Sequence, residues 1–206
     1  MLRLAATLFA IFCLASGVVT AQDIFKEAKA SFIFNGERVN ISRENQEPAR
    51  IATRFSTNGA ECGEPCIAPM VIAEGIETFG ELDVLAFLVN EVAGNTGLMV
   101  DARMPADRAK GYIPGTVSLP FATLSPENEF KDEILRALGV REIDGMFTFT
   151  DARELLVYDN GPSADDAGKL VRNLLDEGYP ASKIRYYRGG MQVWAILGFS
   201  IKEVTS

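Results

Sequence analysis

The chain has 206 residues, of which 48% are apolar and 23% are charged. This composition suits one folded domain with a hydrophobic core and excludes a disordered chain. The net charge is −8, from 20 basic and 28 acidic residues. An acidic surface repels nucleic acid and anionic lipid, so we expect neither as a partner. The sequence contains no histidine, which excludes a Ser-His-Asp triad, a Cys-His dyad and a zinc site with imidazole ligands.

Residues 1–21 have the pattern of a secretory signal peptide. Arg3 precedes a short apolar run over residues 4–14, and small residues follow as far as Ala21. The run is shorter than the roughly 20 residues that a membrane-spanning helix needs, and no later segment is long enough either. We therefore expect cleavage before Gln22 and export to the periplasm or another external compartment, with no membrane span after cleavage.

Residues 22–70 contain strand signals and turn residues, whereas strands and helices alternate in the rest of the chain. We expect residues 22–70 to form an N-terminal extension. Strand-like runs over 31–34 and 37–41 flank Asn35-Gly36, and this dipeptide is a strong signal for a tight hairpin because both of its positions need positive φ. A hairpin alone is marginally stable, so we expect it to pack on the main domain. The segment Ile51 to Ser56 is expected to add another strand.

Cys62 and Cys66 are the two cysteines that remain after residues 1–21 are removed. In an oxidising compartment such a close pair predicts a disulfide, although closing so short a loop contributes only about 2 kcal/mol. Two alternatives stay open. Together with Met70 the pair offers three soft ligands that could hold Cu(I), and either thiol could serve thiol–disulfide exchange or sulfur relay. We expect the disulfide, with no metal and no cofactor.

From residue 71 to residue 206, short apolar runs alternate with segments of helical periodicity. A capping-box pattern at Thr78 and Glu81 predicts the start of the first helix. We expect strands over 98–101, 155–158 and 184–187. We expect a first helix that runs from the cap at Thr78 to Val92, and further helices over 130–138, 164–175 and 191–197. Buried strands separated by helices predict an α/β domain with a parallel sheet and helices on both faces. Sites in such sheets lie at the carboxyl ends of the strands.

Two separated motifs resemble the signatures of rhodanese domains. The first half is Asp101-Ala102-Arg103 followed by Gly111-Tyr112-Ile113-Pro114-Gly115-Thr116-Val117-Ser118-Leu119-Pro120. The second half is Leu156-Val157-Tyr158, a loop, a helix, then Gly178-Tyr179 and Arg188-Gly189-Gly190-Met191-Gln192-Val193-Trp194. Order and spacing fit over about residues 76–202. The resemblance implies a rhodanese-like fold for residues 71–206, with an extension of the kind seen in exported rhodanese-like proteins.

Three of these residues are expected at the rim of the site, with a scaffold role. Asp101 ends a strand and Arg103 follows two positions later, so a charge-assisted hydrogen bond could tie the strand end to the next loop. Gly189, with Gly190, lets the backbone bend sharply between a strand and a helix. Trp194 is the only tryptophan and is expected to fill the core.

The loop after residue 158 should carry the chemistry. In active rhodaneses a cysteine stands directly after this strand, and its thiolate accepts sulfur from a donor such as thiosulfate. Here the loop contains Asp159, Asn160, Gly161, Pro162, Ser163, Ala164 and Asp165. A carboxylate cannot form a persulfide, but it can accept the hydrogen bonds of the loop amides. We therefore expect Asp159 to occupy the anion site from within, and no catalytic residue in this loop.

The resulting hypothesis is a non-catalytic binding or regulatory module that acts on an unidentified partner protein in the cell envelope. The alternative is a sulfurtransferase or thiol-redox enzyme that uses Cys62 or Cys66. Ser163 lacks a base that would activate it, because the chain has no histidine. The partner, the pathway, the oligomeric state and the redox state of the two cysteines stay open at this stage.

Overall fold

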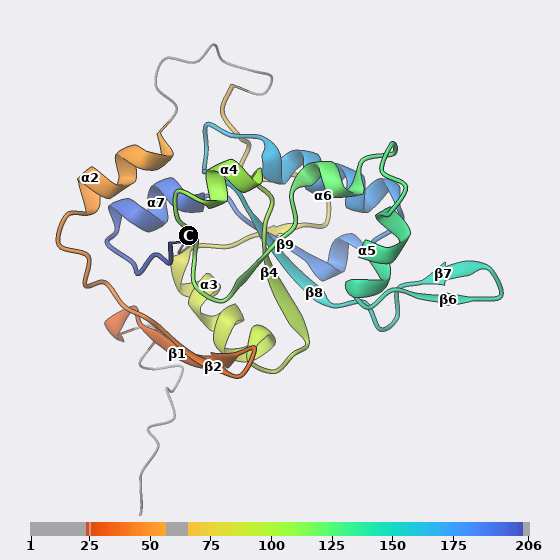
Figure 1. Ribbon diagram of the computed structural model, residues 1–206, viewed down its shortest axis with the longest axis horizontal. Coiled ribbons are helices and arrows are strands. Elements are labelled where there is room, and N and C mark those ends of the chain that lie inside the picture. Colours follow the sequence, from red (N-terminus) through yellow and green to blue (C-terminus); the bar gives the residue numbers. More distant parts are fainter. Residues whose placement is uncertain (1–23, 25, 57–65, 204–206) are drawn as a thin grey trace, which may run out of the picture.

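A five-stranded parallel sheet forms the centre of the protein (Figure 1). The computed structural model describes residues 24, 26–56 and 66–203. The strands, in their order across the sheet, are β3 (Glu77–Thr78), β9 (Ile184–Tyr187), β8 (Glu154–Tyr158), β4 (Gly97–Asp101) and β5 (Thr116–Ser118). The predicted α/β fold with a parallel sheet is confirmed.

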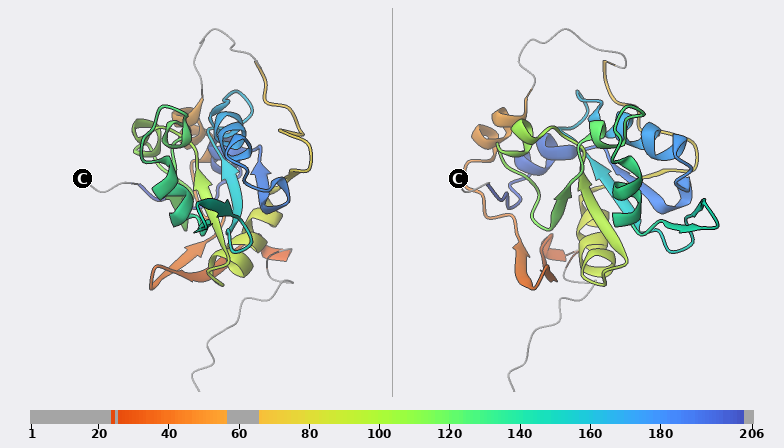
Figure 2. Two further views of the ribbon diagram at one scale, coloured as in Figure 1. Left: turned by 90° about the vertical axis from the view of Figure 1, so that its right-hand side faces the viewer. Right: turned by 45° about the vertical axis from the view of Figure 1, so that its right-hand side comes forward.

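Helices cover both faces of this sheet (Figure 2). One face packs against α3 (Glu81–Phe87), its π-helical continuation η2 (Leu88–Val92) and α7 (Gly190–Ile196). The other packs against α5 (Lys131–Ala137) and α6 (Asp166–Asp176). Along β8, Leu156 and Tyr158 belong to the first core, whereas Leu155 and Val157 belong to the second. The apolar run of this strand is continuous because both of its faces are buried.

The predicted N-terminal hairpin is also confirmed. Strand β1 (Ala30–Phe34) pairs antiparallel with β2 (Glu37–Ile41). Asn35 and Gly36 have φ values of 50° and 81°, the left-handed conformation that a tight hairpin turn requires. Phe32 and Ile41 are buried in the core that contains α3 and α7. The hairpin therefore lies on the same side of the sheet as these two helices.

The prediction of a strand over Ile51 to Ser56 is wrong. The chain forms helix α2 (Pro48–Ala52) and the 3₁₀ turn η1 (Thr53–Phe55) instead. Pro48 stands in the first helical turn, where its missing N–H would have no partner in any case. Phe55 is buried in the same core as Trp194, so tertiary packing favours the helical form.

Two helices begin later than predicted. The start of α3 is held by Asp83, whose Oδ2 accepts a hydrogen bond of 2.9 Å from the backbone N–H of Gly80. Thr78 lies in β3 instead and donates its hydroxyl to the carbonyl of Met70. Helix α6 begins at Asp166, two residues beyond the predicted start, because the preceding residues belong to the loop after β8.

A second hairpin was not predicted. Strands β6 (Arg141–Ile143) and β7 (Met146–Thr148) pair antiparallel around Asp144 and Gly145, whose φ values are 51° and 77°. Figures 1 and 2 show this hairpin projecting from the body of the protein. The remaining elements are α4 (Pro105–Arg108), η3 (Phe121–Leu124) and η4 (Ala181–Lys183). Within the described residues, no helix has the length and apolar character needed to cross a membrane.

Candidate functional site

The loop between β8 and α6, residues 159–165, lies at the carboxyl edge of the sheet. It follows Tyr158, next to the end of β4 at Asp101 and the end of β9 at Tyr187. Its backbone is tied to the start of α7, because the carbonyls of Asp159 and Asn160 accept hydrogen bonds from the amides of Met191 and Gln192 at 3.0 and 2.9 Å. The predicted loop is therefore where the parallel topology places it.

The Asp159 side chain points into this loop and is fully buried. Its Oδ1 accepts a hydrogen bond of 2.8 Å from the amide of Gly161, and its Oδ2 accepts one of 2.9 Å from the amide of Ala167, in the first turn of α6. Burial raises the pKa of Asp159 to about 7, and the two amide donors oppose this rise. The carboxylate thus takes the position that a bound anion would take at a helix N-terminus.

Gly190 allows this close packing. Its φ is +55°, and a Cβ atom there would lie 2.5 Å from the carbonyl oxygen of Asp159 and 2.5 Å from the amide nitrogen of Gly161. Such contacts exclude any side chain without movement of the loop backbone. The expected rim residue Gly189 stands directly before it, packed against the ring of Tyr187. The pair of glycines therefore brings the backbone of α7 against the loop.

Asp101 and Arg103 form the predicted ion pair, and both are fully buried. Nε and Nη2 of Arg103 donate to the two carboxylate oxygens of Asp101 at 2.8 and 2.7 Å. Nη1 of Arg103 reaches the loop and donates to Oδ1 of Asn160 at 3.1 Å. Burial lowers the pKa of Arg103, but the hydrogen bond and charge of Asp101 outweigh this effect and raise it overall. The pair thus connects the end of β4 to the loop after β8.

Two further side chains belong to this network and were missed by sequence reasoning. Arg108 and the hydroxyl of Tyr158 donate to Oδ2 of Asp101 at 2.8 and 2.9 Å. Burial, together with the charge of Asp101, raises the pKa of Tyr158. Nothing in the local sequence points to these contacts, since they depend on how α4 and β8 meet β4. Asp101 and its partners Arg103, Arg108 and Tyr158 form a largely buried network beneath the rim of the site.

The remaining polar loop residues have partners. Ser163 Oγ accepts a hydrogen bond of 3.0 Å from Nε2 of Gln192, which also donates to the carbonyl of Phe55. Asp165 forms an ion pair with Arg172 at 2.8 Å. Gly161 is buried, and Pro162 and Ala164 are half-buried. These contacts tie the polar side chains of the loop to neighbouring parts of the domain.

The N-terminal extension lies against the same loop. The amide of Ala68 donates to the carbonyl of Pro162 at 2.7 Å, and Nε of Arg188 donates to the carbonyl of Ala68 at 2.8 Å. A second contact of the extension is made by Phe55, whose ring centre lies 5.8 Å from Cζ of Arg103. Cys62 lies outside the described residues, so its expected disulfide with Cys66 and the copper alternative with Met70 stay predictions.

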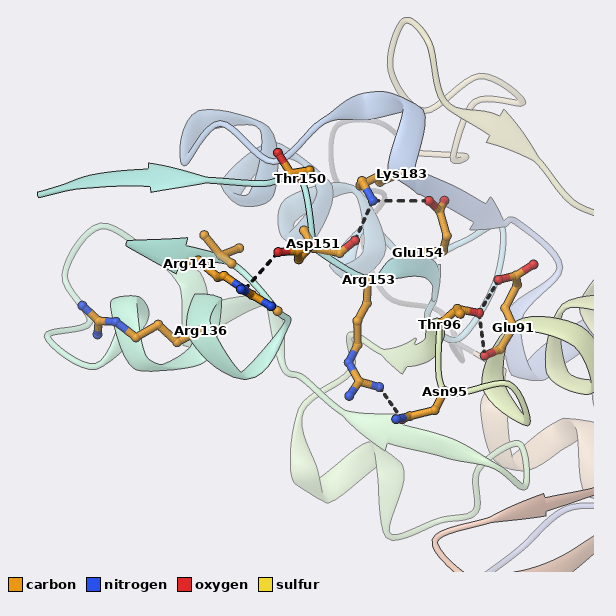
Figure 3. A pocket seen from close by; sticks show the side chains of 13 residues that line it. Glu91, Asn95, Thr96, Arg136, Arg141, Thr150, Asp151, Arg153, Glu154 and Lys183 are labelled. Atoms are coloured by element: carbon orange, nitrogen blue, oxygen red, sulfur yellow. Dashed lines mark hydrogen bonds and ion pairs between the residues drawn. The ribbon is translucent and has the colours of Figure 1, made fainter. Parts of the chain in front are cut away.

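A separate cavity of about 640 Å³ lies at the opposite edge of the sheet (Figure 3). Its lining includes Glu154, the first residue of β8, and Lys183, directly before β9. Several of its charged side chains are paired, as in the contacts of Arg141 with Asp151 and of Lys183 with Glu154 (Figure 3). Because the strands are parallel, this cavity and the loop after β8 lie at different ends of the sheet, and we treat it as no part of the candidate site.

Comparison with known proteins identifies the family of the chain. The family model for the rhodanese-like domain matches residues 86–197. This match covers more than half of the chain, so the chain belongs to the rhodanese-like domain family. No curated protein sequence matches the chain significantly.

Three solved structures illustrate the likeness. A protein of unknown function from Rhodopseudomonas palustris, described as a possible tyrosine phosphatase, is 19% identical, with 71% of this chain and 99% of that chain covered and a TM-score of 0.47. Thiosulfate sulfurtransferase from Pseudomonas aeruginosa is 19% identical, with 80% and 25% covered and a TM-score of 0.44. Reduced CoADR-RHD from Bacillus anthracis is 15% identical, with 60% and 17% covered and a TM-score of 0.40. The chain thus spans a quarter or less of the last two proteins, and these likenesses concern the fold alone.

Proposed function

We propose that this protein is an exported rhodanese-like domain that does not transfer sulfur and instead acts as a binding or regulatory module for a protein of the cell envelope. The observation that carries this proposal is the buried Asp159 carboxylate, whose two oxygens accept hydrogen bonds from the amides of Gly161 and Ala167. Sulfur transfer by the usual rhodanese route needs a thiolate at this position, and a carboxylate cannot form a persulfide.

Electrostatics support the absence of sulfur transfer. Asp159 already satisfies two of the amides that would receive an anion. Asp165 and Asp166, which follow it, form ion pairs with Arg172 and Lys169. The ionised Asp159 carboxylate repels anionic donors such as thiosulfate. The loop therefore combines the wrong nucleophile with an unfavourable charge.

Surface composition supports a binding role. Ile67, Met70 and Val71 lie on the segment that Ala68 ties to the loop, and all three side chains are more than half exposed. Exposed apolar groups that gather in one place commonly mark protein interaction sites. We place the partner contact at this segment together with the neighbouring loop.

A thiosulfate:cyanide sulfurtransferase assay tests the proposal. We expect no activity above background for the wild type. The variant Asp159→Cys places a thiol at the nucleophile position, and Asp159→Ser is its matched control without sulfur. Persulfide formation on each variant is read by mass spectrometry after incubation with thiosulfate. Turnover by the wild-type protein at a rate above that of Asp159→Ser would overturn the non-catalytic assignment.

A second candidate function is thiol–disulfide exchange or sulfur relay through Cys62 or Cys66. The hydrogen bond between Ala68 and Pro162 favours it, because it holds a residue two positions from Cys66 against the loop. A thiol count on the protein purified from the cell envelope, followed by incubation with a dithiol, tests this function. Exchange that is lost in Cys66→Ser would support it, and complete resistance to the dithiol would reject it.

Export is tested independently. The amino terminus of the protein recovered from the periplasmic or secreted fraction is expected at Gln22. Recovery of the intact chain, with Met1 retained, in the cytoplasmic fraction would contradict export without affecting the proposal about Asp159.

A further inference from the structure

The projecting hairpin of β6 and β7 has an open strand edge. Its two strands pair only with each other among the described residues. In a hairpin with a two-residue turn, the pair that flanks the turn exchanges hydrogen bonds and the next pair does not. Ile143 and Met146 flank the turn, so Phe147, opposite Glu142, directs its backbone N–H and C=O outward. Neither group has a hydrogen-bond partner within the described part of the chain.

One face of the hairpin contacts the domain. Arg136 of α5 forms an ion pair of 2.6 Å with Glu142, and its Cζ lies 5.7 Å from the ring centre of Phe147. At the base of the hairpin, Phe149 packs edge-on against Tyr179, with 5.7 Å between ring centres. The opposite face is bare, with Ile143 58% and Met146 71% exposed. The contacts with the domain thus lie on one face of the hairpin.

Strand β7 lacks the charges and prolines that often protect an open edge. Residues 146–150 read Met-Phe-Thr-Phe-Thr, with no charge and no proline. Aromatic residues and threonine favour extended structure, and natural edge strands are normally protected by charge, proline or a bulge. By contrast, β6 carries Arg141 and Glu142. The two edges of the hairpin therefore differ, and only β7 is suited to accept another strand.

We propose that β7 pairs antiparallel with β7 of a second copy of this chain, about a two-fold axis at Phe147. The outward N–H and C=O of Phe147 would then exchange two hydrogen bonds with those of the other copy, and Met146 would lie opposite Thr148. This register opposes no like charges, whereas pairing of β6 with itself would place Glu142 opposite Glu142. Charge thus favours the edge of β7 over that of β6 and allows β7 to pair with a copy of itself without repulsion. A strand of three residues buries little surface, so the dimer is weak and reversible.

Sedimentation equilibrium of the purified protein from micromolar to millimolar concentration tests the pairing. We expect the average mass to rise from monomer toward dimer over this range. The double variant Met146→Lys with Thr148→Lys places like charges opposite each other and should stay monomeric. Mixing it with Met146→Glu, Thr148→Glu should restore association. Ile143→Lys is the matched control, because it adds one charge to the same face but on β6, and it should still dimerise.

A wild-type protein that stays monomeric across the whole range would overturn the proposal, and would leave the edge to a strand of another protein. The same holds if the double lysine variant associates as the wild type does, or if the mixture of oppositely charged variants fails to associate. The wild-type measurement alone tests whether the chain dimerises, even if a variant does not fold. Its result does not depend on the proposed role of Asp159.

Discussion

The backbone amide of Ala167 donates a hydrogen bond of 2.9 Å to Oδ2 of Asp159. The first turn of α6 is therefore held by the side chain that opens the loop before it. Charged acceptors at a helix N-terminus are stabilising because the amides there lack partners within the helix. In this protein the acceptor is fully buried, so the same group also carries a cost of desolvation.

The balance of these two effects predicts a pH dependence. Burial raises the pKa of Asp159 from 3.8 to about 7, so the folded protein holds this proton more tightly than the unfolded chain does. Between about pH 4 and pH 7 the free energy of unfolding should fall as pH rises, by about 1.4 kcal/mol for each unit of pKa shift. Asp159→Asn cannot titrate and should lack this component. Chemical denaturation of both proteins across the range measures it, and parallel curves would contradict the prediction.

Removal of the buried Asp101 charge should be costly. Asp101→Asn leaves Arg103 fully buried without its carboxylate and also weakens the contact of Arg108. We expect a loss of about 3–5 kcal/mol in the free energy of unfolding, because an uncompensated charge stays buried. Asp107→Asn is the control, since its ion pair with Lys110 is partly exposed and should contribute less than about 1 kcal/mol. Urea denaturation compares the two variants, and similar losses would refute a special role for Asp101.

Gly190 and Gly145 offer a matched pair of substitutions. Both have positive φ, but a Cβ atom at position 190 would collide with the backbone of the loop, whereas one at position 145 meets nothing within 4 Å. Gly145→Ala should cost about 1–2 kcal/mol, from backbone conformation alone. Gly190→Ala should cost clearly more and should lower the melting temperature further. Equal effects in thermal unfolding would mean that the loop yields easily to the added methyl group.

Arg188→Met should loosen the extension from the loop. The variant removes the hydrogen bond from Nε to the carbonyl of Ala68, which should cost about 1–2 kcal/mol locally. Hydrogen exchange is expected to accelerate in peptides that cover residues 66–71 and 160–164, with little change elsewhere. Arg38→Met, on the exposed N-terminal hairpin, is the control. If exchange in these peptides matches that of the control, the extension is held by other contacts.

The features that the sequence predicted correctly depend on short-range signals. The apolar runs that end at Asp101 and Tyr158 gave two central strands, because strands buried on both faces are apolar throughout. Asn35-Gly36 predicted its hairpin through turn chemistry. Asp144-Gly145 carries the same kind of signal, and turn chemistry alone would have predicted the second hairpin.

Other features depend on long-range packing. Residues 51–56 contain apolar side chains that suit a strand or a short helix. Burial of Phe55 in the core favours the helical form. Arg108 joins Asp101 only because α4 folds back over the end of β4. The contact of Ala68 with Pro162 spans nearly a hundred positions in the chain, and no local pattern contains it.

Phe55 lies outside the region that defines the family, yet its ring stands next to the guanidinium of Arg103. A fragment trimmed to the family boundaries would lose this aromatic cover and let water reach the central arginine. Water would screen the attraction between Arg103 and Asp101. The electrostatic surroundings of the loop are thus set in part by residues that lie beyond every rhodanese signature.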